Sequence, residues 1–174
     1  MLYYIFKLMD RVKRKAYSKY YKRILNIHRS VSLGEVVLDK KNITIDKGSY
    51  IRSGEVASGE ASVVIGRYCA IGSNVSIRAR SHDFRVPTAS DFNEENLRVH
   101  GDIIIGDYVW IGNNVFIRHG VKIGDHAIIG ANSVVVSDVP DRAIYAGVPA
   151  KLIRINEELI EPELRSSVVG ENEV

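Results

Sequence analysis

The sequence predicts an all-β solenoid, because an aliphatic residue recurs every six positions over two long stretches. Neither an α-helix nor an ordinary strand has a period of six, whereas a coil does if each unit supplies one short strand and one corner. Glycine follows most of these residues, but Arg118 and Val136 break the pattern and lie 18 residues apart. We therefore expect three units per turn of a triangular coil, with glycine where the backbone turns tightly or takes a positive φ. The repeating aliphatic residues are Ile65, Ile71, Ile77, Ile105, Ile111, Ile117, Ile123, Ile129 and Val135.

A second row of often smaller residues lies two positions before the first. Because side chains alternate along a strand, both rows point to the same side, the interior of the coil. Cys69, the single cysteine of the 174-residue chain, belongs to this row. It is expected to be a buried apolar residue that forms no disulfide framework and cannot serve as a nucleophile. The row comprises Val63, Cys69, Val75, Ile103, Val109, Val115, Val121, Ala127 and Ser133.

Residues 1–30 are predicted to form a basic, amphipathic helical segment. Residues 1–28 contain eight lysines and arginines against one acid, Asp10. Two interpretations stay open: attachment to an anionic membrane surface, or packing on the solenoid end with a solvated basic face. We expect no signal peptide, no membrane-spanning run and no nucleic-acid surface. The apolar stripe consists of Ile5, Leu8, Met9, Val12, Ala16, Tyr20 and Ile24.

The solenoid domain is predicted over residues 31–155, beginning near Leu33 and passing through an irregular stretch at 52–61. If Arg78 and Arg118 occupy the same corner, an uninterrupted coil would place the next glycine at position 84. The glycine is Gly106, so an insertion of 22 residues leaves the coil as a loop at 79–102. Long loops on a rigid scaffold often carry function.

The solenoid ends in a segment rich in proline and glycine, 145–154, that we expect to be extended and to fold back over the last coil. Residues 156–174 form an acidic tail, with six glutamates against Arg165.

The loop places one histidine in a distinctive position. His82 lies at its root, where an imidazole could take a proton from a hydroxyl or amine at neutral pH. His28 and His100 are expected to have surface roles, and His119 and His126 to lie near corners. Trp110, the single tryptophan, precedes Ile111 and should face outward, covering a subunit interface or a flexible ligand arm.

Two further motifs carry a family resemblance. With the hexads and the loop histidine, Asp107–Asn114 (DYVWIGNN) and Ala146–Arg154 (AGVPAKLIR) make residues 60–155 similar to the hexapeptide-repeat acyltransferases. More narrowly, the chain resembles sugar O-acetyltransferases such as the maltose and galactoside acetyltransferases. The resemblance implies a left-handed parallel β-helix, a homotrimer, and acetyl-CoA bound in grooves between subunits, with no metal.

The resemblance also implies roles at the reaction centre. His82 matches the general base that deprotonates the acceptor hydroxyl, and Trp110 the aromatic beside the reactive end of acetyl-CoA. The backbone N–H of Asn113 matches the donor to the thioester oxygen, where one such donor stabilises the transition state by roughly 3 kcal/mol. The neighbouring Asp83 and Phe84 are candidate acceptor-binding residues.

Three other residues are expected to hold the rest of the co-substrate. Ala131 lies where backbone contacts hold the pantetheine arm, and Lys151 and Arg154 match cations near the nucleotide phosphates. Two positions depart from the family pattern: Ser137 stands in place of a frequent lysine, and His119 in place of the usual corner proline.

The predicted function is acetyl-CoA-dependent O-acetylation of a sugar hydroxyl, in bacterial surface polysaccharide biosynthesis, by a cytoplasmic enzyme or one peripheral to the inner membrane. Short acceptor-binding N-terminal motifs are not recognisable, which favours a nucleotide-linked or lipid-linked sugar over a free disaccharide. Three alternatives stay open: an N-acetyltransferase of a nucleotide-linked amino sugar, a zinc enzyme like the gamma-class carbonic anhydrases using His82, His119 and His126, and a non-catalytic solenoid trimer.

Overall fold

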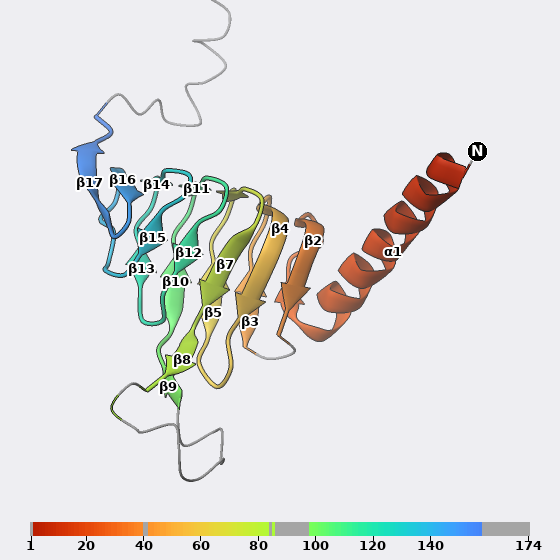
Figure 1. Ribbon diagram of the computed structural model, residues 1–174, viewed down its shortest axis with the longest axis horizontal. Coiled ribbons are helices and arrows are strands. Elements are labelled where there is room, and N and C mark those ends of the chain that lie inside the picture. Colours follow the sequence, from red (N-terminus) through yellow and green to blue (C-terminus); the bar gives the residue numbers. More distant parts are fainter. Residues whose placement is uncertain (1, 40–41, 84, 86–97, 158–174) are drawn as a thin grey trace, which may run out of the picture.

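The computed structural model describes residues 2–39, 42–83, 85 and 98–157, and it is a parallel β-solenoid with one N-terminal helix (Figure 1). In chain order the elements are α1 (Leu2–Ile24), β1 (Asn26–Ile27), β2 (Ser32–Leu38), β3 (Ile43–Ile45), β4 (Tyr50–Ala57), β5 (Val63–Ile65), β6 (Ala70–Ile71), β7 (Val75–Arg78), β8 (Arg80–His82), β9 (Arg98–His100), β10 (Ile103–Ile105), β11 (Trp110–Ile111), β12 (Phe116–Ile117), β13 (Lys122–Ile123), β14 (Ile128–Ile129), β15 (Val134–Val135), β16 (Ala143–Gly147) and β17 (Ala150–Ile155).

The strands lie on three faces of the coil. The first face is the sheet β1-β3-β5-β10-β13. The second carries β6, β11 and β14, and the third carries β7, β12 and β15. The second and third faces join into one sheet because β4 runs around the corner between them, pairing with both β6 and β7.

Both predicted rows of side chains form the core. Ile65, Ile105 and Ile123 stack in register on successive coils, and all three are buried. The smaller row is buried as well, Cys69 completely. Burying these branched side chains in an unbroken column supplies the main driving force for folding, about 1.5–3 kcal/mol for each fully buried side chain.

The pairing of strands on the first face also gives the length of the insertion. Ile105 and Ile123 are 18 residues apart, but Ile65 and Ile105 are 40 apart, so 22 residues leave the coil between β7 and β10. They leave and return through the antiparallel pair β8 and β9, the stem at the bottom of Figure 1.

Of the two predicted reasons for a glycine in the hexads, a tight turn or a positive φ, the positive φ does not apply, and the glycines allow close approach between coils. A Cβ on Gly112 would lie 2.6 Å from the backbone nitrogen of Ala131 in the next coil. The left-handed residue comes two positions after the glycine, as at Asn114 (φ 57°) and Tyr108 (φ 57°). Asparagine tolerates this region, whereas tyrosine is uncommon there.

Side chains at the left-handed positions stack from coil to coil. At one corner the amides of Asn74, Asn114 and Asn132 form a ladder with two hydrogen bonds of 3.0 Å. At another, Tyr108 stacks on Tyr68 and on His126, with ring centroids 5.2 and 5.0 Å apart. These contacts offset the backbone strain at each position.

Carboxylates cap the N–H groups that follow the hexad glycines. Asp107 Oδ1 accepts the Arg67 N–H at 2.7 Å, Asp125 Oδ1 accepts that of Asp107 at 2.7 Å, and Asp141 Oδ1 accepts that of Asp125 at 2.9 Å. At this corner, each of these three backbone donors is thus paired with a carboxylate of the next coil.

Two predicted boundaries were wrong. The coil begins before Leu33, because Asn26 and Ile27 already pair with β3. The stretch 52–61 is not irregular throughout, since β4 continues to Ala57. Its polar, glycine-containing sequence hid a strand that turns a corner at Gly54 (φ 134°).

Helix α1 leaves the first coil and runs away from it (Figure 1). Its C-terminal end packs on the solenoid, where Tyr21 and the following Leu25 contact the core. Val12, Tyr20 and Ile24 of the predicted apolar stripe are exposed. Within the described part of the chain, no helix has the length and apolar character needed to cross a bilayer.

The carboxylate ladder predicts a stability effect at Asp107. Asp107→Ala removes the acceptor for the Arg67 N–H, and the free energy of unfolding in urea should fall by about 1–3 kcal/mol. Asp107→Asn keeps an acceptor oxygen and should lose less.

The same pair predicts a pH dependence. Hydrogen bonds from Arg67, first from its side chain, lower the pKa of Asp107. The ionised Asp107 therefore stabilises the fold above its pKa in the unfolded chain, about 3.9. This stabilisation is lost as the pH falls through the lower pKa of the folded protein. Asp107→Asn should lack this acid loss; an Asp107→Ala variant as stable as the wild type would contradict the capping role.

Candidate functional site

Trp110 belongs to a row of outward side chains on the second face. The strand register places Trp110, Ile128, Ile144 and Arg154 side by side on β11, β14, β16 and β17. Trp110 is 57% exposed and Arg154 is also exposed. Three strand spacings separate them, roughly 14 Å. An elongated ligand along this row could therefore touch the indole at one end and a cation at the other.

Asn113 lies at the corner that follows this face. Its Oδ1 accepts the Ser73 N–H at 2.8 Å, as the ladder pattern requires. The Asn113 N–H would in turn need a side-chain acceptor from position 131, but that residue is alanine. Among the described residues no acceptor is paired with the Asn113 N–H. Ala131 therefore leaves a fixed, exposed backbone donor at this corner.

The neighbouring predicted residues lie on the same edge. Ala131 is exposed, and its own N–H has no acceptor among the described residues. Lys151 pairs with Ala146 in the β16–β17 hairpin, which extends the second face. The fold thus brings Trp110, Asn113, Ala131, Lys151 and Arg154 together along one side of the solenoid.

His82 lies at a different corner. It ends β8, opposite Arg98 of β9, and its side chain is exposed. The third face, with β7 and β12, separates it from Asn113. One chain therefore does not bring the candidate base and the candidate donor together. A pocket of about 620 Å³ adjoins His82, lined by Ser81, His82, Asp83, Arg85, Val99, Arg118 and His119.

Asp83 is engaged by Arg85 and not by His82. Its carboxylate accepts the Arg85 backbone N–H at 3.0 Å and the guanidinium at 2.8 and 2.6 Å. These hydrogen bonds, chiefly from the side chain, lower the pKa of Asp83 to about 2. Asp83 stays ionised and holds the turn after His82. Phe84 lies outside the described residues.

Two lining residues were not predicted as acetyltransferase site residues: Arg118, and His119, which was considered only as a ligand of the alternative zinc site. Arg118 Nε–H donates to His119 Nε2 at 3.3 Å. Burial, more than the charges of Arg118 and His100, lowers the pKa of His119, so its ring is neutral at pH 7. The sequence did show that His119 replaces the usual corner proline. That substitution alone did not indicate a pocket beside His82.

The remaining reactive side chains have structural surroundings. Burial raises the pKa of the Cys69 thiol to about 11, which opposes formation of a nucleophilic thiolate. His126 stacks on Tyr108 at a corner away from His82 and His119. Across the described ranges, no three histidine, cysteine or acidic side chains are grouped so that they could hold a metal ion.

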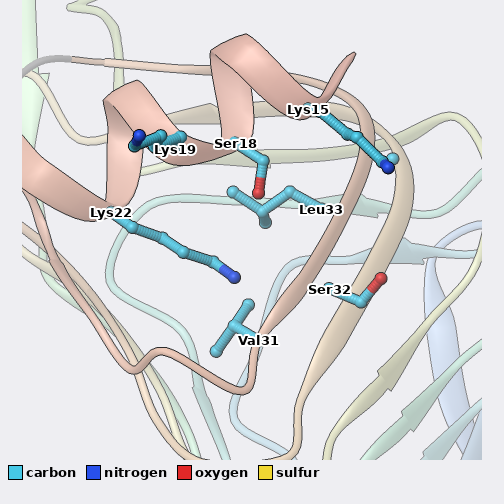
Figure 2. A pocket seen from close by; sticks show the side chains of 8 residues that line it. Lys15, Ser18, Lys19, Lys22, Val31, Ser32 and Leu33 are labelled. Atoms are coloured by element: carbon cyan, nitrogen blue, oxygen red, sulfur yellow. The ribbon is translucent and has the colours of Figure 1, made fainter. Parts of the chain in front are cut away.

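A further cavity, of about 690 Å³, lies between α1 and the first coil (Figure 2). Lys22 and Ser18 point into it above Val31 and Leu33, and Lys15 and Lys19 stand at its sides. It contains none of the predicted catalytic residues. It does show that the side of α1 facing the solenoid is largely basic.

Comparison with known proteins points to one family. Residues 102–137 match the family described as bacterial transferase hexapeptide (six repeats). The "Probable macrolide acetyltransferase" of Lysinibacillus sphaericus is 42% identical over 115 residues, 57% of this chain and 64% of that protein. The galactoside O-acetyltransferase of Escherichia coli (strain K12) is 34% identical over 113 residues, 65% of this chain and 54% of that protein. The chain thus spans between about half and two thirds of these curated relatives.

A solved structure extends the similarity over more of the chain. The hexapeptide-repeat acetyltransferase of Vibrio cholerae O1 biovar eltor, complexed with acetyl coenzyme A, is 30% identical with a TM-score of 0.68. The match covers 84% of this chain and 78% of that one. The six-residue repeat, the solenoid and these similarities together show that the chain belongs to the hexapeptide-repeat acetyltransferase family.

Proposed function

We propose that this protein is an acetyl-CoA-dependent O-acetyltransferase that modifies a sugar hydroxyl. The observation that carries the proposal is the uncapped N–H of Asn113 beside Trp110, on the edge that ends in Lys151 and Arg154. A thioester placed beside Trp110 would have its carbonyl oxygen near this donor. The phosphates would lie toward the two cations, where charge-assisted hydrogen bonds are strongest. The galactoside relative supports a sugar as acceptor.

The proposed reaction is direct transfer in a ternary complex. His82 takes the proton of the acceptor hydroxyl as its oxygen attacks the thioester carbonyl carbon. The Asn113 N–H stabilises the oxyanion that forms, and it does so more strongly than the neutral carbonyl because charge develops there. The intermediate then expels the coenzyme A sulfur, which takes the proton from His82. The products are an acetyl ester and free coenzyme A.

The separation of His82 from Asn113 within one chain supports an assembled site. We propose a homotrimer in which the His82 corner of one copy faces the Asn113 edge of its neighbour. A closed ring of three identical copies would repeat this contact three times, as cyclic symmetry requires.

The acceptor proposed is a saccharide of bacterial surface polysaccharide synthesis, linked to a nucleotide or a lipid. Acetylation of an amino group on a nucleotide-linked sugar would use the same base and donor. A panel that includes both kinds of acceptor distinguishes the two reactions.

We also propose that α1 lies on an anionic membrane surface. Its apolar stripe is not covered by the solenoid: Val12 is 59% exposed, Tyr20 45% and Ile24 42%. Basic residues flank the stripe on both sides, as in helices that lie in the interface of a bilayer. The same charge disfavours pairing of α1 with α1 of another copy, because like charges would meet.

The first test of the activity is release of the coenzyme A thiol. Wild-type protein with acetyl-CoA and a panel of sugars, nucleotide sugars and lipid-linked saccharides should acetylate at least one acceptor. His82→Ala should lower kcat by about 10²–10⁴-fold, because general base catalysis is lost. His28→Ala, at the other end of the solenoid, is the control and should keep full activity. Failure of the wild type to turn over any acceptor or to bind acetyl-CoA would reject the proposal.

The uncapped donor predicts an unusual variant. Ala131→Asn supplies the amide oxygen that the ladder lacks, so the Asn113 N–H should become occupied. Thermal stability should hold or rise, while kcat falls by about 10²-fold or more. Ala131→Leu introduces a branched side chain similar in shape to asparagine but without an acceptor oxygen, and its kcat should fall less. Equal losses in both variants, with equal coenzyme A affinity, would contradict the role of the N–H.

The membrane proposal is tested by co-sedimentation with vesicles. Wild-type protein should bind vesicles containing phosphatidylserine or phosphatidylglycerol, and binding should weaken as salt rises. Replacing Val12, Tyr20 and Ile24 together by serine should weaken binding about tenfold or more, because the apolar burial is lost. Val37→Ser removes a 63% exposed aliphatic side chain from the solenoid and serves as control. Salt-independent binding, or an unaffected triple variant, would refute the proposal.

A further inference from the structure

The pocket beside His82 has a second wall that the proposed chemistry does not use. Arg118 and His119 line it together with His82. Both follow β12, on the coil above the one from which the β8–β9 stem leaves. Arg118 is exposed, and His119 is partly buried.

The hydrogen bond between these two residues fixes what they offer to a ligand. The Arg118 Nε–H donates to His119 Nε2, so that ring nitrogen is an acceptor and the ring proton belongs on Nδ1. Holding Nε also restricts the guanidinium, whose terminal N–H groups stay available. The wall therefore presents hydrogen-bond donors.

The charge of the described lining residues is positive, which also favours an anionic ligand. Among the described residues that line the pocket, Asp83 is the one acid, and it is already paired with Arg85. Arg118 has no carboxylate partner among the described residues, so these lining residues together carry one uncompensated positive charge. A neutral sugar could accept these hydrogen bonds but would leave the positive charge unpaired, whereas a carboxylate or phosphate matches the wall in both charge and hydrogen bonding.

We propose that Arg118, oriented by His119, binds an anionic group of the acceptor, a carboxylate or a phosphate, beside the hydroxyl that His82 deprotonates. The proposal rests on the acetyltransferase function and narrows its acceptors to charged saccharides. Two kinds of acceptor carry this chemistry: sugar acids, and sugars linked through a phosphate to a nucleotide or lipid.

The test compares acceptors by charge. Initial rates are measured with a neutral hexoside, its uronic acid and its 1-phosphate, for wild type, Arg118→Gln and Arg118→Lys. For the anion that the site takes, Arg118→Gln should raise KM about tenfold or more while kcat changes little. Arg118→Lys should recover part of the loss. The neutral hexoside should be a poor acceptor for all three proteins, and Arg29→Gln, an exposed arginine on the first coil, should behave as wild type.

A binding measurement separates failure of this proposal from failure of the proposed function. Calorimetric titration of the same three saccharides into His82→Ala needs no turnover. Anion binding that disappears in His82→Ala/Arg118→Gln supports the subsite even if no acceptor is acetylated. His119→Pro, which restores the usual corner residue, should weaken anion binding while the Tm is kept. The proposal would be overturned if His82→Ala/Arg118→Gln bound the anions as tightly as His82→Ala does. Equal binding of the neutral hexoside and both anions would overturn it as well.

Discussion

Hydrogen bonds between successive coils are the constraint on which this structure depends. The Gly106 N–H donates to the Ile123 carbonyl and the Gly112 N–H to the Ile129 carbonyl, each at 2.8 Å. At these two corners, coils held this closely leave no room for a Cβ, so glycine follows the buried aliphatic residue. The next N–H then points toward the coil above, where only a side chain can accept it. The residue required at each corner is therefore determined by the corner one turn below.

That dependence explains how a regular scaffold can present an open hydrogen-bond donor. Ser73 is capped by Asn113, but Asn113 meets Ala131 and keeps its donor exposed. One small side chain in the next coil is enough to expose the donor, and the coils on either side hold its direction fixed. Such fixed donors stabilise developing charge better than water, because they need not reorganise during the reaction.

The sequence predicted the two buried rows and the 22-residue insertion, because both follow from hexad spacing alone. It did not separate the two properties of glycine, a missing Cβ and a free φ, since either would place glycine at the same position. It also missed the strand through Arg52 and Gly54, where the aliphatic repeat is absent. The open donor could have been found by aligning positions 73, 113 and 131. The separation of His82 from it also followed from placing Arg78 and Arg118 at one corner, but that consequence was not drawn.

Mixing two inactive variants tests the assembled site most directly. His82→Ala keeps an open Asn113 donor, and Ala131→Asn keeps the base. If each site combines His82 of one copy with Asn113 of another, unfolding and refolding the two variants together should restore about a quarter of wild-type activity, the share of correct pairings at random. If both residues act within one chain, the mixture should stay as inactive as its components although the same oligomer forms. That result would contradict a site shared between copies.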